Sequence, residues 1–294
     1  MLPSVVTLQE ARGERSELGS GIILSSDGLI MTTNSVLAGI VGRPEAVQTS
    51  VRFSDGRTAP FEVVATDPRT DVAVVWALGV SRLTPITFGS SADLLVGQPV
   101  AAVGSPLGLT ATVTLGVISA LNRPVLGPDF TAFDAIQTDA ALNPGNSGGA
   151  LVDKDGKLVG MNSATGRLAG NDRRSGSIGI GFAIPADQAR RIASELIATG
   201  SGSHAWLGTE TTSESNSRGA RIMEVRSGSP AAAAGLCPGA LVTRFDNVAI
   251  GSSGGLVAAV QSTPPGATVS MGFIDSSGDE TTVQVVLGSD QGRR

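Results

Sequence analysis

The sequence predicts a mainly β protein in which a long barrel-like unit is followed by a smaller unit of strands and helices. Three observations lead to this fold class. Short apolar runs separated by glycine turns fill residues 1 to about 120, a pattern typical of barrels and sandwiches. The first helical period comes only at residues 185–199. A stretch rich in glycine and serine then separates this helix from a second series of strands and helices.

Two hairpins are predicted in the first half of the chain. Residues 21–24 and 29–32 flank an Asp-Gly turn, and residues 51–53 and 61–64 flank another. An Asp-Gly pair between apolar runs is a strong hairpin signal. Further strands are expected at residues 72–77, 99–103 and 113–120. Since no helical period interrupts the series, we expect it to close into a barrel or a sandwich.

The helix predicted at residues 185–199 closes the first domain. Pro185 opens it and Gly200 follows its end, which are the usual positions of these residues at helix termini. Its apolar residues recur at helical spacing, at Ala189, Ile192, Ala193, Leu196 and Ile197. We therefore expect a first domain over residues 1–199 and a flexible linker over residues 200–204.

Residues 205–290 are expected to form a second, smaller α+β domain. A proline opens and a glycine closes a short helix at residues 229–235, and a second helix is expected at residues 256–261. The strands are expected at residues 220–225, 241–245, 269–274 and 281–287. The chain is long enough for two domains with a sizeable core.

The composition argues against several classes of function. Across 294 residues the net charge is −5 and there is no basic run, so a nucleic-acid partner is not expected. The chain has a single cysteine, Cys237, and a single histidine, His204, so neither a disulfide nor a zinc site is expected, and no cofactor is implied. The apolar runs are far shorter than the roughly 18 residues of a membrane span. No signal peptide is visible at Met1, which fits a cytosolic protein or a soluble piece of a longer chain.

A serine framed by glycines is the candidate centre of chemistry. Residues 143–149 have the sequence Asn-Pro-Gly-Asn-Ser-Gly-Gly. Such a bare turn can expose the Ser147 hydroxyl and point the N–H groups of Gly145 and Ser147 at one oxygen, which is what acyl transfer through an oxyanion hole requires. The alternative is a glycine-rich hairpin turn with no chemistry.

The same residues also match Gly-x-Ser-x-Gly, the nucleophile elbow of α/β-hydrolases. That elbow requires a helix directly after the serine. Here residues 150–152 and 158–161 are short apolar runs around an Asp-Gly turn, which predicts two strands instead. The fold that fits is a chymotrypsin-like double β-barrel, in which the serine lies on a loop between strands.

Several motifs in one order make the chain resemble the HtrA/Deg family of serine proteases. They are Gly-Ser-Gly-Ile-Ile-Leu-Ser-Ser-Asp-Gly at residues 19–28, Thr-Asp-Val-Ala-Val at 70–74, Gly-Asn-Ser-Gly-Gly-Ala-Leu at 145–151, Gly-Phe-Ala-Ile-Pro at 181–185, Leu-Gly at 207–208, Ser-Pro-Ala at 229–231 and Ala-Gly at 234–235. The resemblance spans nearly the whole chain. It implies a chymotrypsin-like serine protease domain followed by a PDZ domain.

In the family that the chain resembles, the catalytic triad runs His, Asp, Ser along the sequence. Ser147 matches the nucleophile, and Asp71 matches the aspartate that orients the imidazole. Ser35 stands where the family has its histidine. A serine hydroxyl cannot accept the Ser147 proton near neutral pH, so we expect activity to be lost or severely impaired. The one histidine, His204, is expected to be exposed in the linker and out of reach.

The resemblance also suggests where a substrate binds. The pocket for the residue before the scissile bond is expected along Ala141, Leu142, Asn162, Ser163 and Ala164. No acidic residue stands there, which suits small aliphatic side chains. Residues 167–177 match a regulatory loop of the family, and a surface loop without a role fits them nearly as well.

A PDZ domain implies capture of the C-terminal carboxylate of a peptide. The backbone N–H groups of Leu207, Gly208 and Thr209 are expected to bind it. The peptide would add as a strand beside residues 209–212, against the helix at residues 256–261. Trp206 is either an anchor in this groove or a core residue.

Two functions therefore stand open. One is an HtrA-type serine endopeptidase of envelope protein quality control that lacks its base. The other is a pseudoprotease, a peptide-binding, regulatory or chaperone-like protein that keeps the scaffold and the groove. Expected partners are unfolded or C-terminal segments of proteins, and the resemblance also suggests a homotrimer. It further implies an extracytoplasmic location, in the periplasm or cell envelope, with a membrane anchor in an N-terminal segment that this sequence does not include.

Overall fold

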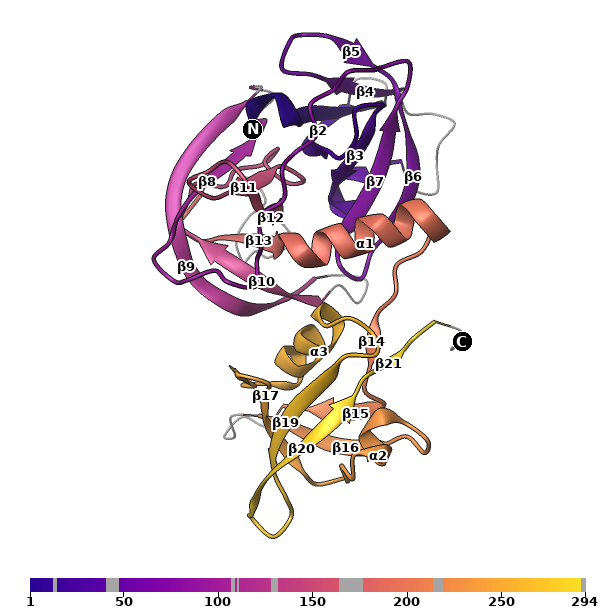
Figure 1. The fold of residues 1–294 in the computed structure, drawn as a ribbon, viewed down its shortest axis with the longest axis vertical. Coiled ribbons are helices and arrows are strands. Elements are labelled where there is room, and N and C mark those ends of the chain that lie inside the picture. The colour runs from indigo at the N-terminus through magenta and orange to yellow at the C-terminus, as the bar shows by residue number, and fades with distance from the viewer. Residues whose placement is uncertain are drawn as a thin grey trace. The chain divides into compact units, whose positions relative to one another are not determined.

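The chain divides into two compact units (Figure 1). The computed structural model describes residues 1–12, 15–40, 48–106, 109, 111–127, 132–163, 177–213 and 219–291. The first unit contains Met1–Leu121 and Ala135–Gly202, and the second contains Ser203–Arg294 with the short pieces Asn122–Pro128 and Ala132–Asp134. The glycine-framed serine belongs to the first unit, and the predicted carboxylate-binding loop belongs to the second.

A seven-stranded sheet forms the N-terminal part of the first unit. Its strands are β1 (Val5–Arg12), β2 (Arg15–Ile23), β3 (Leu29–Thr32), β4 (Gln48–Arg52), β5 (Thr58–Ala59), β6 (Phe61–Asp67) and β7 (Val72–Ala77). They lie in the order β5-β4-β1-β2-β3-β7-β6, over a buried apolar cluster that includes Leu8, Ile30 and Val75. Two 3₁₀ turns accompany the sheet, η1 (Leu2–Ser4) before β1 and η2 (Asn34–Leu37) after β3.

The first predicted hairpin is confirmed and the second is partly wrong. β2 pairs with β3 in a register that sets Ile22 opposite Met31. After the turn at residues 54–57, β4 pairs with β5, while β6 pairs with β7. Pro60 separates β5 from β6, and because proline has no N–H it cannot continue a ladder.

The second part of this unit is a closed barrel in the order β10-β13-β12-β11-β8-β9. Its strands are β8 (Pro99–Gly104), β9 (Thr112–Leu126), β10 (Ala132–Thr138), β11 (Ala150–Val152), β12 (Leu158–Ser163) and β13 (Gly181–Pro185). Ile118, Ile136 and Leu151 are buried in its core. Residues 143–149, called the serine loop from here on, lie between β10 and β11. A strand follows Ser147, so the structure agrees with a serine on an inter-strand loop and not with a nucleophile elbow.

Helix α1 (Ala186–Thr199) confirms the helix predicted at this place and packs against β6, β7 and β12 (Figure 1). Pro185 is its N-cap residue, and Gly200 ends it with a φ of 77° and an N–H donated to the Leu196 carbonyl. Ile197, expected on the buried face, is 41% exposed. It lies at the margin of the apolar stripe, where the helix surface turns towards solvent.

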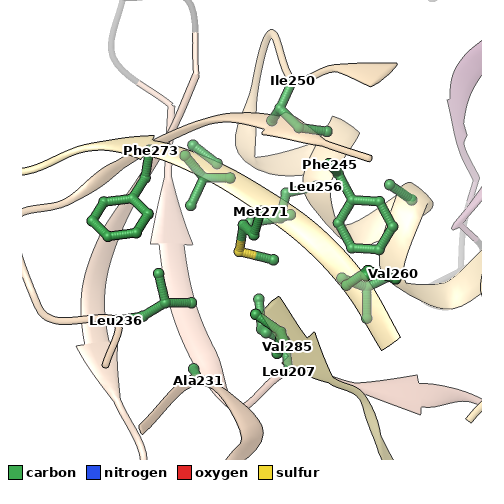
Figure 2. Packing of buried hydrophobic residues seen from close by; sticks show 14 of the residues in the cluster. Leu207, Ala231, Leu236, Phe245, Ile250, Leu256, Val260, Met271, Phe273 and Val285 are labelled. Atoms are coloured by element: carbon green, nitrogen blue, oxygen red, sulfur yellow. The ribbon is translucent and has the colours of Figure 1, made fainter. Parts of the chain in front are cut away.

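The second unit is a small α+β fold. Its strands are β14 (Ala205–Trp206), β15 (Thr209–Thr212), β16 (Ala220–Val225), β17 (Leu241–Phe245), β18 (Val248–Ala249), β19 (Thr268–Ile274), β20 (Glu280–Val286) and β21 (Gly288–Ser289), and its helices are α2 (Pro230–Ala233) and α3 (Ser253–Ser262). The main sheet has the order β15-β16-β17-β19-β20, with β18 beside β17, and β14 pairs with β21. The four predicted strands and both predicted helices lie where they were expected. Figure 2 shows Met271 near the centre of the apolar core, with Phe273 on one side and Phe245 on the other.

His204 is part of the second unit and is only 3% exposed. Its N–H donates to the Asp290 carboxylate at 3.0 Å, and its carbonyl accepts the N–H of Asp290 at 3.0 Å. The expectation of an exposed linker histidine is therefore wrong. The backbone bonds to Asp290 already hold the chain in the fold before β14 begins.

Gly148 is the position in the serine loop where we expect a side chain to be least tolerated. Its φ is 81°, and a Cβ there would lie 2.2 Å from the Ser20 carbonyl oxygen and 2.3 Å from Thr32 Oγ1. We expect Gly148→Ala to lower the free energy of unfolding by about 2–4 kcal/mol, because alanine disfavours this backbone conformation and clashes with neighbouring main chain. Gly56→Ala is the matched control, since Gly56 has a φ of 87° with nothing within 4 Å of a Cβ. Urea unfolding measures both variants, and an equal loss would contradict the close packing.

Candidate functional site

A buried carboxylate at the start of β7 gathers several hydrogen-bond donors. Asp71 is 2% exposed. Ser35 donates its N–H to Asp71 Oδ1 at 2.8 Å and its hydroxyl to Oδ2 at 3.2 Å. The Ser163 hydroxyl also donates to Oδ2, at 3.0 Å. These donors hold the carboxylate in one orientation, because hydrogen bonds to a charged acceptor are strong and directional. The part played by Ser163 beside Asp71 was not predicted.

The strand pairing explains why Ser35 and Asp71 meet. β3 and β7 are neighbours, with Thr32 opposite Ala73, so the turn that follows β3 lies beside the residue that precedes β7. Asn34 donates its N–H to the Asp71 carbonyl at 3.1 Å. Asp71 has a φ of 58°, a left-handed conformation that aspartate tolerates better than most residues.

Ser20 on β2 holds the serine loop with both its main chain and its side chain. Its N–H donates to the Ser147 carbonyl at 2.8 Å. Its hydroxyl donates to the Gly145 carbonyl at 2.7 Å and accepts the N–H of Ser105 at 2.8 Å. The Thr32 hydroxyl donates to the Ser20 carbonyl at 2.7 Å. This role was not predicted, although a serine between two glycines in a strand is a visible signal of close backbone approach.

Gly145 and Ser147 are expected to form the oxyanion hole with their N–H groups. They are also the two residues whose carbonyls accept hydrogen bonds from Ser20. Gly145 has a φ of 99°, which favours glycine. Within the described residues, no acceptor takes the Gly145 N–H. The N–H of Asn146, which lies between them, is bonded to the Asn143 carbonyl at 3.0 Å. Such a fixed turn suits the donation of backbone N–H groups to an external oxygen.

The end of β12 brings the serine loop and the Asp71 carboxylate together. The Asn162 carbonyl accepts the N–H of Gly148 at 2.9 Å, and the Asn162 N–H donates to the Gly149 carbonyl at 2.8 Å. The next residue, Ser163, carries the hydroxyl bonded to Asp71. Asn162 and Ser163, two consecutive residues of β12, therefore contact the serine loop and the Asp71 carboxylate respectively.

The residues expected to line a substrate pocket have different environments. Ala141 and Leu142 are half-buried. Asn162 is fully buried, and its amide donates to two main-chain carbonyls, at 3.3 and 3.1 Å, so its side chain faces the barrel interior. Ala164 and residues 167–176 lie outside the described residues. The pocket and the regulatory loop stay predictions.

In the second unit, the loop before β15 presents backbone N–H groups. The Leu207 carbonyl accepts the N–H of Ala231 at 3.0 Å, and the Gly208 carbonyl accepts the N–H of Arg226 at 2.9 Å. In the part of the chain that the structure describes, no acceptor takes the N–H of Leu207 or Gly208. Gly208 has a φ of 86°, and a Cβ there would lie 2.2 Å from Ser229 Cβ. Backbone N–H groups presented in this way form a concave anion-binding site.

Strand β15 and helix α3 face each other beside this loop. β15 is the end strand of its sheet, and the Ser253 hydroxyl at the start of α3 donates to the Thr211 carbonyl at 3.1 Å. Val257, one helical turn after Ser253, is 39% exposed. The half-buried Trp206 lies against Gly208, where a Cβ would come within 3.0 Å of its ring.

The described residues offer no metal centre. No group of three or more His, Cys, Asp or Glu side chains among them could hold a metal ion. Cys237 is exposed. No helix in the described ranges is both long and apolar enough to cross a membrane.

Two domain families and several solved structures match the chain. Residues 19–161 match the trypsin-like peptidase domain, and residues 205–287 match the PDZ domain. Serine protease PepD of Mycobacterium tuberculosis is 57% identical over 98% of this chain and 64% of its own length. Periplasmic serine endoprotease DegP of Escherichia coli is 37% identical over 92% of this chain and 56% of its own length. The structure of HtrA-type protease AlgW with a tripeptide matches with a TM-score of 0.68 and 34% identity, over 98% of this chain and 94% of that chain.

These matches assign each of the two units to a domain family. The chain spans less than two thirds of the length of PepD and DegP. The predicted fold class is confirmed, since trypsin-like barrels are followed by a PDZ domain. Because AlgW is matched over nearly its whole length at more than 30% identity, the chain belongs to the HtrA family of serine proteases.

Proposed function

We propose that this chain is an HtrA-type protease scaffold that is catalytically disabled as its sequence stands and that captures peptides through its PDZ domain. The observation that carries the proposal is the Ser35 hydroxyl, which donates to the Asp71 carboxylate at 3.2 Å. In a serine-protease triad this carboxylate orients the imidazole that serves as the base. Ser35 stands in the position of that base.

The proposed defect is in proton transfer. The base of a triad accepts the proton of the nucleophile and later returns it to the leaving group. A serine hydroxyl is too weakly basic for this near neutral pH, and its side chain is shorter than that of histidine. Loss of the base in a comparable triad lowers kcat on the order of 10⁶-fold. Substrate binding and the oxyanion hole do not require the base, so they are retained.

His204 does not replace the missing base. A general base has to come within hydrogen-bond reach of the nucleophile. The His204 side chain is instead buried in the second unit, and its backbone is bonded to Asp290. Moving it would require opening the fold of that unit.

The rest of the proposed site favours a second candidate function, that of a serine endopeptidase with one catalytic part missing. The Ser163 hydroxyl still holds Asp71, and Ser20 still holds the loop that carries Ser147. The two candidates share one architecture and the same Ser35, and they differ in whether a histidine at that position restores turnover.

Peptide capture is supported by the loop before β15. The N–H groups of Leu207 and Gly208 suit a carboxylate, and Thr209 begins the end strand beside them. A tripeptide is present in the AlgW structure, and DegP is a periplasmic endoprotease. We extend both properties to this chain, as binding of unfolded or C-terminal segments outside the cytoplasm. A homotrimer is part of the same proposal.

The unmodified chain should not hydrolyse β-casein at ordinary enzyme concentrations, because no imidazole deprotonates Ser147. Peptide release measured over hours should match that of Ser147→Ala. Turnover like that of an intact family member, abolished by Ser147→Ala, would contradict the proposal.

Ser35→His should restore proteolysis. The new imidazole would have Asp71 to fix its tautomer and Ser147 to deprotonate, so the gain in kcat approaches the ~10⁶ that loss of a triad base removes. Casein cleavage and labelling by a fluorophosphonate probe report the gain. Ser35→Ala and the double variant Ser35→His, Ser147→Ala are the controls and should stay inactive. If a folded Ser35→His protein neither cleaved casein nor reacted with the probe, only the pseudoprotease function would remain.

The PDZ domain should prefer a free peptide C-terminus. Amidating an apolar C-terminal peptide removes the charge that the N–H groups of Leu207 and Gly208 would bind, and we expect affinity to fall roughly tenfold or more. Calorimetry on the full chain compares the two forms. Equal affinities would rule out carboxylate capture.

A further inference from the structure

The Ser35 hydroxyl is an accessible and weakly bonded partner of the Asp71 carboxylate. Ser35 is exposed, whereas Asp71 and Ser163 are 2% and 3% exposed. The Ser35 hydroxyl lies 3.2 Å from Asp71 Oδ2 and 3.2 Å from Thr33 Oγ1. Its single proton is shared between two acceptors, at a distance beyond the usual range for hydroxyl donors. An N–H donor that approaches from solvent can therefore displace it, while Ser163 and the Ser35 N–H still hold the carboxylate.

The serine loop lies next to the turn that carries Ser35. Thr32 ends β3 three residues before Ser35, and a Cβ at Gly148 would lie 2.3 Å from Thr32 Oγ1. Gly148 directly follows Ser147, which is half-buried and so accessible to solvent. Solvent therefore reaches both the candidate nucleophile and the residue that covers Asp71, on segments of the chain that are in contact.

We propose that the position in front of Asp71 is a binding site for a small external imidazole, and that the chain is a protease dependent on such a ring. This inference rests on the proposed loss of the base at Ser35. A neutral imidazole has one N–H donor and one acceptor nitrogen on opposite sides of the ring. Asp71 accepts the N–H and fixes the tautomer, and the other nitrogen accepts the hydroxyl of Ser147.

The bound ring supplies the proton transfers that Ser35 does not. It takes the proton of Ser147 Oγ as that oxygen bonds to the carbonyl carbon of the substrate. The imidazolium, stabilised by Asp71, returns this proton to the leaving nitrogen as the C–N bond breaks. A water molecule then attacks the acyl ester and gives its proton to the ring, which passes it to Ser147 Oγ. The ring and the serine are regenerated, and only water and the peptide bond are consumed.

The assay uses the full chain without a polyhistidine tag and a fluorogenic peptide without histidine, so that the added molecule is the one external source of imidazole. Without imidazole, cleavage should match that of Ser147→Ala. With imidazole, the rate should rise and saturate at roughly 10²–10⁴ times this background, the usual contribution of a general base. Half-saturation is expected at roughly 1–100 mM for a ligand of so few atoms.

The pH dependence and two analogues test how the ring acts. The neutral ring is the active form, so the rescued rate should rise with pH as the ring loses its proton, near the pKa of about 6.5 of a histidine side chain. Pyrazole has the same shape but is a far weaker base and should not rescue. 1-Methylimidazole is a base of similar strength but has no N–H for Asp71, and its rescue should be roughly tenfold or more weaker.

Variants at position 35 test where the ring binds. Ser35→Ala removes the hydroxyl that imidazole displaces, so its half-saturating imidazole concentration should be roughly three- to tenfold lower than that of the unmodified chain. Ser35→Leu covers the same position with carbon atoms and should abolish the rescue. Equal melting temperatures would show that both variants fold. Ser147→Ala should give no rescue with any of the three molecules.

The outcomes separate this inference from the proposed function. Saturable cleavage that needs imidazole, Ser147 and an open position 35 supports the inference. Equal rates with imidazole and 1-methylimidazole would overturn it, because they would indicate catalysis by the buffer and not by a ring bound to Asp71. If Ser35→His cleaved the peptide while neither the unmodified chain nor Ser35→Ala responded to imidazole, the external site would be overturned and the proposed loss of the base would stand. Cleavage by the unmodified chain without imidazole would contradict both.

Discussion

The proposed catalytic site depends on the hydrogen bonds that join Ser20 to the serine loop. Ser20 belongs to β2 of the N-terminal sheet, whereas the carbonyls of Gly145 and Ser147 that it holds belong to a loop of the closed barrel. Ser20 is fully buried, and a buried backbone group that loses its partner destabilises the fold. Gly148 allows the approach, since a Cβ would meet the Ser20 carbonyl. The contact that joins sheet and barrel therefore also sets the shape of the candidate site.

Stability and activity have different requirements at position 35, because the fold does not need a histidine there. Any residue except proline at position 35 can donate its backbone N–H to Asp71 Oδ1, as Ser35 does at 2.8 Å. The Ser35 hydroxyl supplies a donor for Oδ2, together with Ser163, so the buried carboxylate is not left without partners. A serine at this position therefore satisfies the buried carboxylate without an imidazole, which is the arrangement that the proposed loss of the base requires.

The sequence predicted the elements whose signals are local. The turn between β2 and β3 and the two ends of α1 follow from Asp-Gly, Pro185 and Gly200, each read within a few residues. What escaped prediction depends on residues far apart in the chain. The Ser20 hydroxyl bonds a residue 125 positions away, and Ser163 bonds one 92 positions away. The backbone N–H of His204 likewise bonds Asp290, 86 positions away, and no periodicity near residue 204 signals that pairing.

The two candidate binding sites use backbone in the same way. In the serine loop, Ser20 bonds the carbonyls of Gly145 and Ser147, and in the loop before β15 backbone N–H groups bond the carbonyls of Leu207 and Gly208. Both loops can then present N–H groups to an external oxygen, of a substrate carbonyl in one and of a peptide carboxylate in the other. Fixed donors suffice to bind, whereas catalysis also requires a side chain that moves a proton. Under the proposal that Ser35 replaces the base, turnover is lost while both loops keep the backbone hydrogen bonds that let them present N–H groups, so the scaffold still binds peptides.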